Sequence, residues 1–111
     1  MGLTYKENVA DTRETPTGSI IEELHQYMVK LYGYDCLLND IKEEFGIKGI
    51  SNLGELTGVD CLIINVNHDI FRRITLVDLK AITDANPVLI DIHRLFDESE
   101  AKQMGFHYKS L

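Results

Sequence analysis

Several features that would assign an activity directly are missing from this chain of 111 residues. Its only two cysteines, Cys36 and Cys61, lack CxxC spacing, so neither a disulfide framework nor a zinc site is expected. A reducing compartment, the cytoplasm, is then the simplest location. The four histidines show no HxxxH spacing, which argues against a metal site. No GxGxxG or GxxxxGK[ST] pattern occurs, so the chain has no dinucleotide or nucleoside-triphosphate cradle of its own.

Long apolar runs and an excess of positive charge are also missing. No stretch approaches the roughly 18 apolar residues that span a bilayer, and the start has no cationic segment followed by an apolar one. The chain carries 11 Lys plus Arg against 18 Asp plus Glu, a formal net charge of −7. This charge disfavours nucleic acid and anionic membranes as partners, because both surfaces are negative. The length fits one compact domain, so a cleft between two domains would need a wall from elsewhere.

The apolar pattern alternates between strand-like and helix-like spacing and predicts an α/β fold. We expect a Rossmann-like three-layer sandwich with a mainly parallel sheet. The expected strands are 3–6, 35–39, 61–66, 88–92 and 106–108, and the expected helices or helical turns are 16–31, 41–45, 51–56, 69–71, 76–82 and 98–104. Thr15 is the expected cap of the first helix, Tyr27 and Met28 are expected on its buried face, and Gly33 is expected to end it. Ser51 is the expected cap of 51–56, His68 is expected to end a strand before the turn at 69–71, and Pro87 is expected to open the run 88–92. The run 61–66 is the most hydrophobic and is expected at the sheet centre, covered on both faces. The first strand is truncated, which favours a fragment of a longer protein.

Three cationic side chains follow the carboxyl ends of expected strands. Lys6 and Arg13 lie in the polar loop after the first strand, and Arg94 follows the run that ends at Ile92. Ligands of open α/β sheets bind at this edge, and helix starts there favour anions. A lysine offers one point charge, whereas an arginine can fork onto phosphate or carboxylate oxygens. The pattern predicts an anion site; the alternative is that these cations pair with acidic neighbours such as Glu7, Asp11, Glu14 and Asp97.

No residue set stands out for catalysis. Cys61 lies within the most apolar run, where a thiol acts as a small hydrophobe with a raised pKa, and Cys36 has a similar setting. There is no Ser, His and Asp arrangement and no carboxylate pair. We therefore assign no catalytic residue and no metal ligand within this chain.

The start of the chain, G-L-T-Y-K-E-N-V-A-D-T-R-E-T-P, carries a recognisable pattern. It resembles the G-hydrophobic-x-[FY]-K-x-[ND]-x-x-D-x-R-x-[ST]-P segment that opens the C-terminal domain of the UDP-glucose/GDP-mannose dehydrogenase family. Three further stretches match in order and spacing, namely N-H-D-I-F at 67–71, D-I-H-R-L-F-D at 91–97 and G-F-H-Y at 105–108. The resemblance covers nearly the whole chain and implies that residues 1–111 form a single nucleotide-sugar-binding domain.

The resemblance also implies a reaction. Members of the family use NAD to oxidise the sugar C6 alcohol of a nucleotide sugar to a carboxylate, through a thiohemiacetal on a cysteine. Their NAD-binding domain, their dimer contacts and their nucleophile lie in regions that this chain does not resemble. The fragment alone would then be inactive. Its partners would be a UDP-sugar and the remaining domains of a homo-oligomeric parent enzyme. The segments D-T-R-E-T-P and H-D-x-F look closer to dehydrogenases of N-acetylated amino sugars than to the UDP-glucose type.

The same resemblance assigns roles to individual positions. Tyr5 and Lys6 match the aromatic–lysine pair at the substrate, and Lys6 would contact the sugar nucleotide. Arg13 matches the arginine that faces the cofactor. Arg94 matches an arginine with which some members hold the substrate.

The chain departs from the family pattern at one motif and leaves another class of function open. Ile92 and His93 replace the common Gly and Arg, so that His93 takes part of the substrate role or none. The alternative function is that of a free-standing Rossmann-like interaction or regulatory module. Such a module would bind a partner protein through its truncated first strand. A small self-sufficient enzyme is disfavoured, because no nucleophile or acid–base pair is found.

Overall fold

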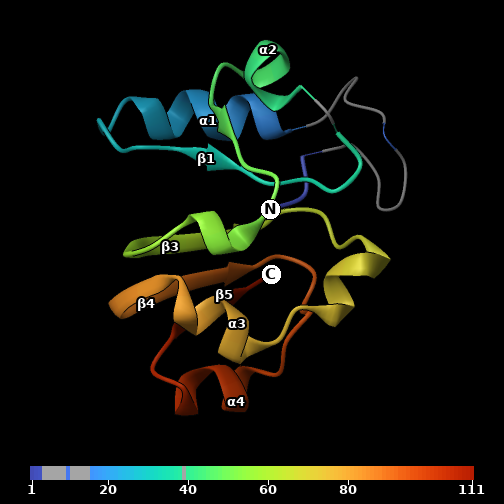
Figure 1. The fold of residues 1–111 in the computed structure, drawn as a ribbon. Helices are drawn as coiled ribbons and strands as arrows, with labels where there is room; N and C mark the ends of the chain where they lie inside the picture. Colours follow the sequence, from blue (N-terminus) through green and yellow to red (C-terminus); the bar gives the residue numbers. More distant parts are fainter. Residues whose placement is uncertain (4–9, 11–15, 39) are drawn as a thin grey trace.

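The computed structural model describes residues 1–3, 10, 16–38 and 40–111 (Figure 1). Helices, including the short 3-10 helices η1 and η2, alternate with strands along the chain, which confirms the predicted α/β class. In chain order the elements are α1 (Thr17–His25), β1 (Tyr32–Gly33), α2 (Ile41–Phe45), β2 (Lys48–Gly49), η1 (Leu53–Glu55), β3 (Val59–Ile64), η2 (Asp69–Arg73), α3 (Leu76–Ala81), β4 (Thr83–Asp91), α4 (Glu98–Gln103) and β5 (His107–Ser110).

The strands form two small sheets, and all strand pairs among the described residues are parallel. One sheet pairs β1 with β2, and the other has the order β3, β4, β5. In Figure 1, α1 and α2 lie beside the first sheet, and α3 and α4 lie on the opposite side of the molecule, beside β4 and β5.

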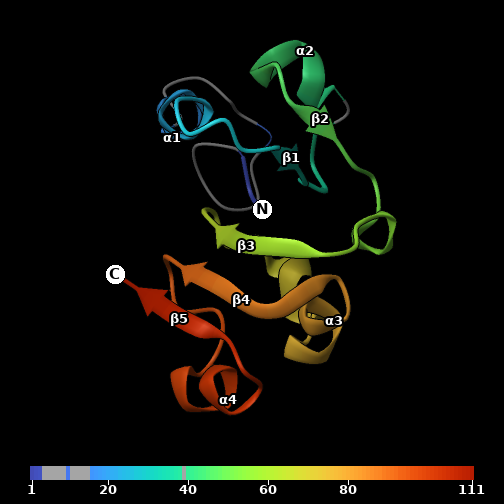
Figure 2. The ribbon, with the colours of Figure 1, turned by 90° about the vertical axis from the view of Figure 1, so that its left-hand side faces the viewer.

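The segment Met1–Leu3 lies between the two sheets and is hydrogen-bonded to both (Figures 1 and 2). Its amino group donates to the carbonyl of Ile63 (2.6 Å), and its first carbonyl accepts from the N–H of Asn65 (2.8 Å). On the other side, Gly2 donates to the carbonyl of Tyr34 (3.0 Å). The order across the molecule is therefore β2, β1, Met1–Leu3, β3, β4, β5, which is the order of a doubly wound dinucleotide-binding fold.

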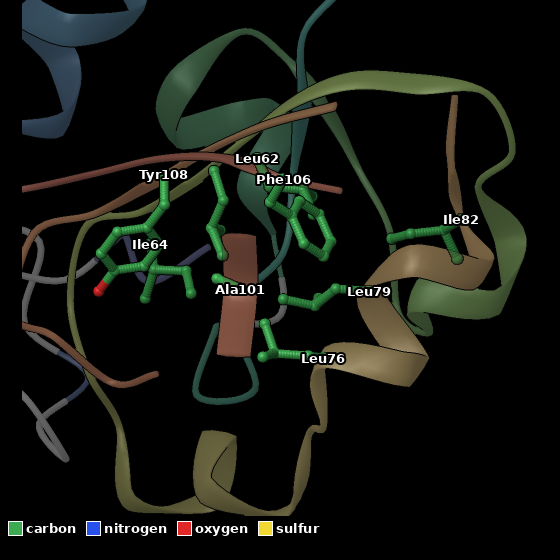
Figure 3. Packing of buried hydrophobic residues seen from close by; sticks show 9 residues of the cluster. Leu62, Ile64, Leu76, Leu79, Ile82, Ala101, Phe106 and Tyr108 are labelled. Atoms are coloured by element: carbon green, nitrogen blue, oxygen red, sulfur yellow. The ribbon is translucent and has the colours of Figure 1, made fainter. Parts of the chain in front are cut away.

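The main hydrophobic core lies against β3, β4 and β5 (Figure 3). Alternate residues of β3 contribute to it, and the short helices α3 and α4 cover it, because helices this short are stable only when packed on a sheet. Its buried members are Leu62, Ile64, Leu76, Leu79, Ile82, Leu89, Ala101, Phe106 and Tyr108. A smaller second cluster joins the start of the chain to α1, α2 and the turn before β2 and contains Leu3, Ile21, Ile41 and Ile47.

Most sequence predictions for the second half of the chain are confirmed. Strands occur at 59–64, 83–91 and 107–110, and helices at 76–81 and 98–103. Pro87 lies within β4 rather than at its start. The helix 98–103 ends before Gly105, whose φ of 93° favours glycine. The predicted helical turns at 41–45 and around Phe71 are also present as α2 and η2.

The first helix is shorter than the apolar spacing predicted. α1 ends at His25, and Met28 adopts a left-handed backbone conformation (φ 57°) that stops a helix. Tyr27 and Met28, which the spacing placed on the buried face, are 70% and 94% exposed. The prediction of a helix as far as residue 31 is wrong, because Tyr27, Met28 and Val29 form an outer surface. The predicted cap, Thr15, lies outside the described residues.

The prediction of a strand at 35–39 is also wrong. The carboxylate of Asp35 accepts the N–H of Leu37 (2.8 Å), which makes a side-chain-closed turn in place of a strand. The strand β1 comes earlier and includes Gly33, which was expected to end a helix. At 51–56 the structure has the short helix η1, and its cap is Asn52 rather than Ser51.

Both cysteines were expected to be buried, and both are exposed. Cys36 lies in the turn that follows Asp35. Cys61 is in the first half of β3, where burial begins only at Leu62. The expectation that the whole run 61–66 is covered on both faces is therefore wrong at its amino end.

We predict opposite effects for alanine at two glycines of the first half. Gly2 has a φ of 78°, and a Cβ there would lie 2.2 Å from the Val66 carbonyl oxygen, so Gly2→Ala should lower the free energy of unfolding by about 2 to 4 kcal/mol. Gly18 is in α1, and a Cβ there would meet no atom within 4 Å, so Gly18→Ala should raise it by about 0.5 to 1 kcal/mol. Urea unfolding measures both, and equal stabilities would contradict the placement of Met1–Leu3.

Candidate functional site

The carboxyl ends of the parallel strands meet along one edge of the molecule. β1 leads to Asp35, β3 leads to the segment 65–68, and β4 leads to the segment 92–94. α1 starts at the same edge, because the Thr17 hydroxyl donates to the carbonyl of Leu3 (3.2 Å). In a doubly wound sheet, ligands bind where the strand order reverses, which here is between Met1–Leu3 and β3. We call this region the switch-point edge.

Asp35 connects three segments at the switch-point edge. Its carboxylate accepts the N–H of Leu3 (2.7 Å) and the N–H of Leu37 (2.8 Å), and it lies 3.0 Å from Nε2 of His68. The side chains of Asp35 and His68 are 0% and 1% exposed. A buried carboxylate needs several such partners to offset its lost hydration. Asp35 thereby fixes the end of the segment Met1–Leu3, shortly before Tyr5 and Lys6 in the sequence.

Two asparagines after β3 face the same region. The side-chain amide of Asn65 donates to the Thr17 hydroxyl (3.0 Å) and to the Gly2 carbonyl (3.4 Å), which ties β3 to the start of α1. The side-chain oxygen of Asn67 is buried and has no hydrogen-bond partner within the described part of the chain. Such an orphaned acceptor costs about 1 to 3 kcal/mol, and a hydrogen-bond donor on a ligand would satisfy it.

The loop after β4 is shaped by a second buried carboxylate. Asp91 is fully buried and accepts the N–H groups of Leu95 (2.9 Å) and Phe96 (2.8 Å) and the hydroxyl of Tyr108 (2.8 Å). Burial and this hydrogen bond raise the pKa of Tyr108, so its hydroxyl remains a donor. With the loop held in this way, Arg94 adopts a left-handed conformation (φ 55°), and its side chain is exposed.

The structure places one of the predicted cationic residues at the switch-point edge. Arg94 lies there, next to the exposed His93. Tyr5, Lys6 and Arg13 lie outside the described residues, so the convergence of all three cations stays a prediction. Arg94 forms no ion pair within the described ranges, and the alternative partner Asp97 instead caps α4 by accepting the N–H of Glu100 (3.0 Å).

Sequence reasoning missed Asp35, Asn67 and Asp91 as residues of this edge. His68 was predicted only to end a strand before a helical turn, and η2 does begin directly after it. The signal that could have found them is position, because each lies at or just after the end of a strand. The hydrogen bonds of Asp35, however, reach Leu3 and His68, which lie 32 and 33 positions away in the sequence.

Neither thiol is activated for nucleophilic attack. Desolvation raises the pKa of Cys36 and of Cys61, and the nearby carboxylates of Asp35 and Asp60, respectively, raise them further. Within the described residues no group of three or more His, Cys, Asp or Glu side chains could hold a metal ion. A membrane-crossing helix is likewise absent from the part of the chain that the structure describes.

A comparison of the sequence with models of protein families shows the family to which the chain belongs. The sequence model of the UDP-glucose/GDP-mannose dehydrogenase family, UDP binding domain, matches residues 1–98. The chain belongs to this family. The resemblance seen in the sequence motifs is thereby confirmed, and the match covers the switch-point edge from Met1 to the loop after β4.

Individual members of the UDP-glucose/GDP-mannose dehydrogenase family show the same relationship. The UDP-N-acetyl-D-mannosamine dehydrogenase of Methanococcus maripaludis is 31% identical over 99% of this chain, and the UDP-N-acetyl-D-glucosamine 6-dehydrogenase of Pseudomonas aeruginosa is 30% identical over 91%. The chain spans 25% and 24% of their respective lengths. The crystal structure of the NDP-N-acetyl-D-galactosaminuronic acid dehydrogenase of Methanosarcina mazei Go1 superposes with a TM-score of 0.85 at 22% identity. The superposition covers 98% of this chain and 23% of the Methanosarcina mazei chain, and the two share the fold.

Replacing the Asp35 carboxylate tests its role in this edge. Asp35→Asn retains the size but weakens two backbone hydrogen bonds and the contact with His68, so it should lower the free energy of unfolding by about 2 to 4 kcal/mol. Asp84→Asn is the matched control at an exposed position of β4 and should change it by less than about 0.5 kcal/mol. Urea unfolding compares the two, and equal losses would show that Asp35 does not carry this role.

Proposed function

We propose that residues 1–111 form the C-terminal UDP-sugar-binding domain of an NAD-dependent nucleotide-sugar 6-dehydrogenase. The observation that carries the proposal is the match of residues 1–98 to the UDP binding domain of the family. The relatives named for UDP-N-acetyl-D-mannosamine and UDP-N-acetyl-D-glucosamine support an N-acetylated amino sugar as the substrate. The whole enzyme would oxidise the sugar C6 alcohol to a uronate.

The switch-point edge supplies groups that suit a nucleoside diphosphate. The exposed guanidinium of Arg94 can bind two phosphate oxygens at once, and the start of α1 presents the positive end of its dipole. The orphaned oxygen of Asn67 can accept a hydrogen bond from an N–H or hydroxyl of the ligand. Tyr5 and Lys6 complete the proposed substrate contacts. Each charge-assisted hydrogen bond contributes about 1.5 to 3 kcal/mol before desolvation is deducted.

NAD would be bound mainly by the remaining domains of the parent enzyme. The described residues include no glycine-rich strand–turn–helix that fits a dinucleotide. The cofactor supplies the hydride acceptor, and Arg13 of this chain would face it across the closed cleft. The described thiols are not activated, so we expect this domain alone to be inactive. We also expect the parent enzyme to be cytoplasmic and homo-oligomeric.

Isothermal titration calorimetry of the 111-residue chain tests the proposal. UDP, UDP-N-acetylglucosamine, UDP-N-acetylmannosamine and UDP-glucose would be titrated in turn. We expect dissociation constants from micromolar to millimolar, with the N-acetylated sugars tighter than UDP-glucose. No heat at millimolar ligand, with a protein shown to be folded by circular dichroism, would contradict nucleotide-sugar binding.

Two substitutions separate binding from stability. Arg94→Gly removes the guanidinium but suits the left-handed φ of 55°, so UDP-sugar binding should weaken about tenfold to a hundredfold while the thermal midpoint is retained or rises. Lys6→Ala should likewise weaken binding and leave the midpoint within about 3 °C. Arg73→Ala, at an exposed position of η2, is the charge-matched control and should bind normally. A large loss of stability with unchanged binding would refute the roles given to Lys6 and Arg94.

A further inference from the structure

Tyr108 combines a buried ring with a hydroxyl that leaves the hydrophobic core. Its ring belongs to the main cluster, and its strand, β5, lies at one end of the order β3, β4, β5. In Figure 3 the hydroxyl points away from the other labelled side chains. It donates to Oδ2 of Asp91 (2.8 Å) and lies 3.0 Å from the carbonyl oxygen of Phe96. The hydroxyl therefore connects the core to the loop after β4, at the switch-point edge.

The register of the sheet explains this contact. Leu89 pairs with Tyr108, and Asp91 pairs with Ser110. Because side chains alternate between the two faces of a strand, Leu89, Asp91 and Tyr108 lie on the same face of the sheet. Tyr108 is thus the diagonal neighbour of Asp91, and its long side chain spans the distance to the carboxylate.

The carboxylate of Asp91 is satisfied without a cation. Oδ1 accepts the N–H of Leu95 (2.9 Å), and Oδ2 accepts the N–H of Phe96 (2.8 Å) as well as the hydroxyl of Tyr108. Within the described ranges no ion pair includes Asp91, and Tyr108 is its one side-chain donor. A fully buried carboxylate depends on every such donor, because it has lost its hydration.

Arg94 lies close to Asp91 but does not pair with it. Asp91 and Asp97 are each three positions from Arg94, and both accept backbone N–H groups, Asp97 from Glu100 (3.0 Å). The backbone N–H of Arg94 donates to the Asp91 carbonyl (3.3 Å), and its side chain is exposed. Burial and the hydrogen bond to Asp91 raise the pKa of Tyr108, and the nearby charge of Arg94 acts in the opposite direction. The guanidinium is therefore near this hydrogen bond without being part of it.

We propose that Tyr108 is a positioning residue for nucleotide-sugar binding: its uncharged hydroxyl occupies the Asp91 carboxylate and thereby leaves the guanidinium of Arg94 free to bind the diphosphate. This role rests on the proposed function, in which Arg94 is a substrate contact. Without the hydroxyl, Oδ2 of Asp91 lacks a donor, and Arg94 turns inward to supply one. An arginine that forks onto a carboxylate has fewer N–H groups left for phosphate oxygens.

A conservative variant separates the hydrogen bond from the packing. Tyr108→Phe removes the hydroxyl and retains the ring in the core. Tyr27→Phe makes the same chemical change just after α1, where the side chain is 70% exposed, and serves as the matched control. Arg94→Gly and the double variant Tyr108→Phe/Arg94→Gly complete a cycle that shows whether Tyr108 acts through Arg94. NMR titrations with UDP-N-acetylglucosamine measure binding, and circular dichroism measures folding and the thermal midpoint.

The expected result is a loss of binding that depends on Arg94. Tyr108→Phe should raise the dissociation constant about five- to twentyfold, whereas Tyr27→Phe should leave it within about twofold. In the Arg94→Gly background, Tyr108→Phe should change it by less than about twofold, because no guanidinium remains to be captured. A merely structural role would weaken binding equally in both backgrounds.

A second measurement needs no nucleotide. The guanidinium N–H groups of Arg94 are assigned in ¹⁵N spectra by their loss in Arg94→Gly, and their exchange with water is then measured. In the wild-type chain they should exchange as fast as those of the exposed Arg72 and Arg73. In Tyr108→Phe they should exchange about tenfold more slowly, because they enter hydrogen bonds with Asp91.

Three results would overturn the positioning role. The first is a folded Tyr108→Phe that binds within about twofold of the wild type, with only its thermal midpoint lowered. The second is equal weakening with and without Arg94. The third is an Arg94 guanidinium that exchanges equally in the wild type and in Tyr108→Phe, or, should Tyr108→Phe fail to fold, one already protected in the wild type. If the wild-type chain bound no UDP-sugar, the proposed function would fail, and guanidinium exchange alone would decide whether Tyr108 keeps Arg94 free.

Discussion

The hydrogen bonds of Met1–Leu3 are the constraint on which the rest of the structure depends. They join a two-stranded and a three-stranded sheet into one doubly wound order, and the carboxylate of Asp35 holds the segment at its carboxyl end. The segment pairs with the ends of both β1 and β3, and the contact of Asp35 with His68 reinforces this connection. The switch-point edge exists because these strands are brought side by side there.

The switch-point edge combines two kinds of residue. Asp35 and Asp91 are buried acceptors that fix the backbone, whereas Arg94 is an exposed cation and Asn67 a buried acceptor without a partner among the described residues. The first kind makes the second possible, because a residue in the left-handed conformation of Arg94 persists only when its surroundings hold it. Both kinds of residue belong to the nucleotide-sugar site that we propose.

The sequence predicted the β3–β5 half well because its apolar runs are buried where they were expected to be. It failed between residues 26 and 38, where Tyr27 and Met28 are apolar yet exposed, and no local pattern reveals which apolar residues lie outside. Arg94 lies three residues after the end of β4, on the edge where it was expected, while its binding role stays a prediction. Asp35 was missed because its partners Leu3 and His68 lie 32 and 33 positions away, which spacing rules do not reach.

The unequal sizes of the two hydrophobic clusters bear on how the molecule opens. Among the described residues, nine buried ones stabilise the β3–β5 half, against four in the cluster that involves α1 and α2. Local opening requires less free energy where fewer apolar contacts are lost, so residues 16–50 should exchange their amide hydrogens through sub-global fluctuations, and the central strands only through complete unfolding. The half that contains the start of α1 is thus the more adaptable part of the molecule, able to adjust to a bound ligand while the β3–β5 half keeps its shape.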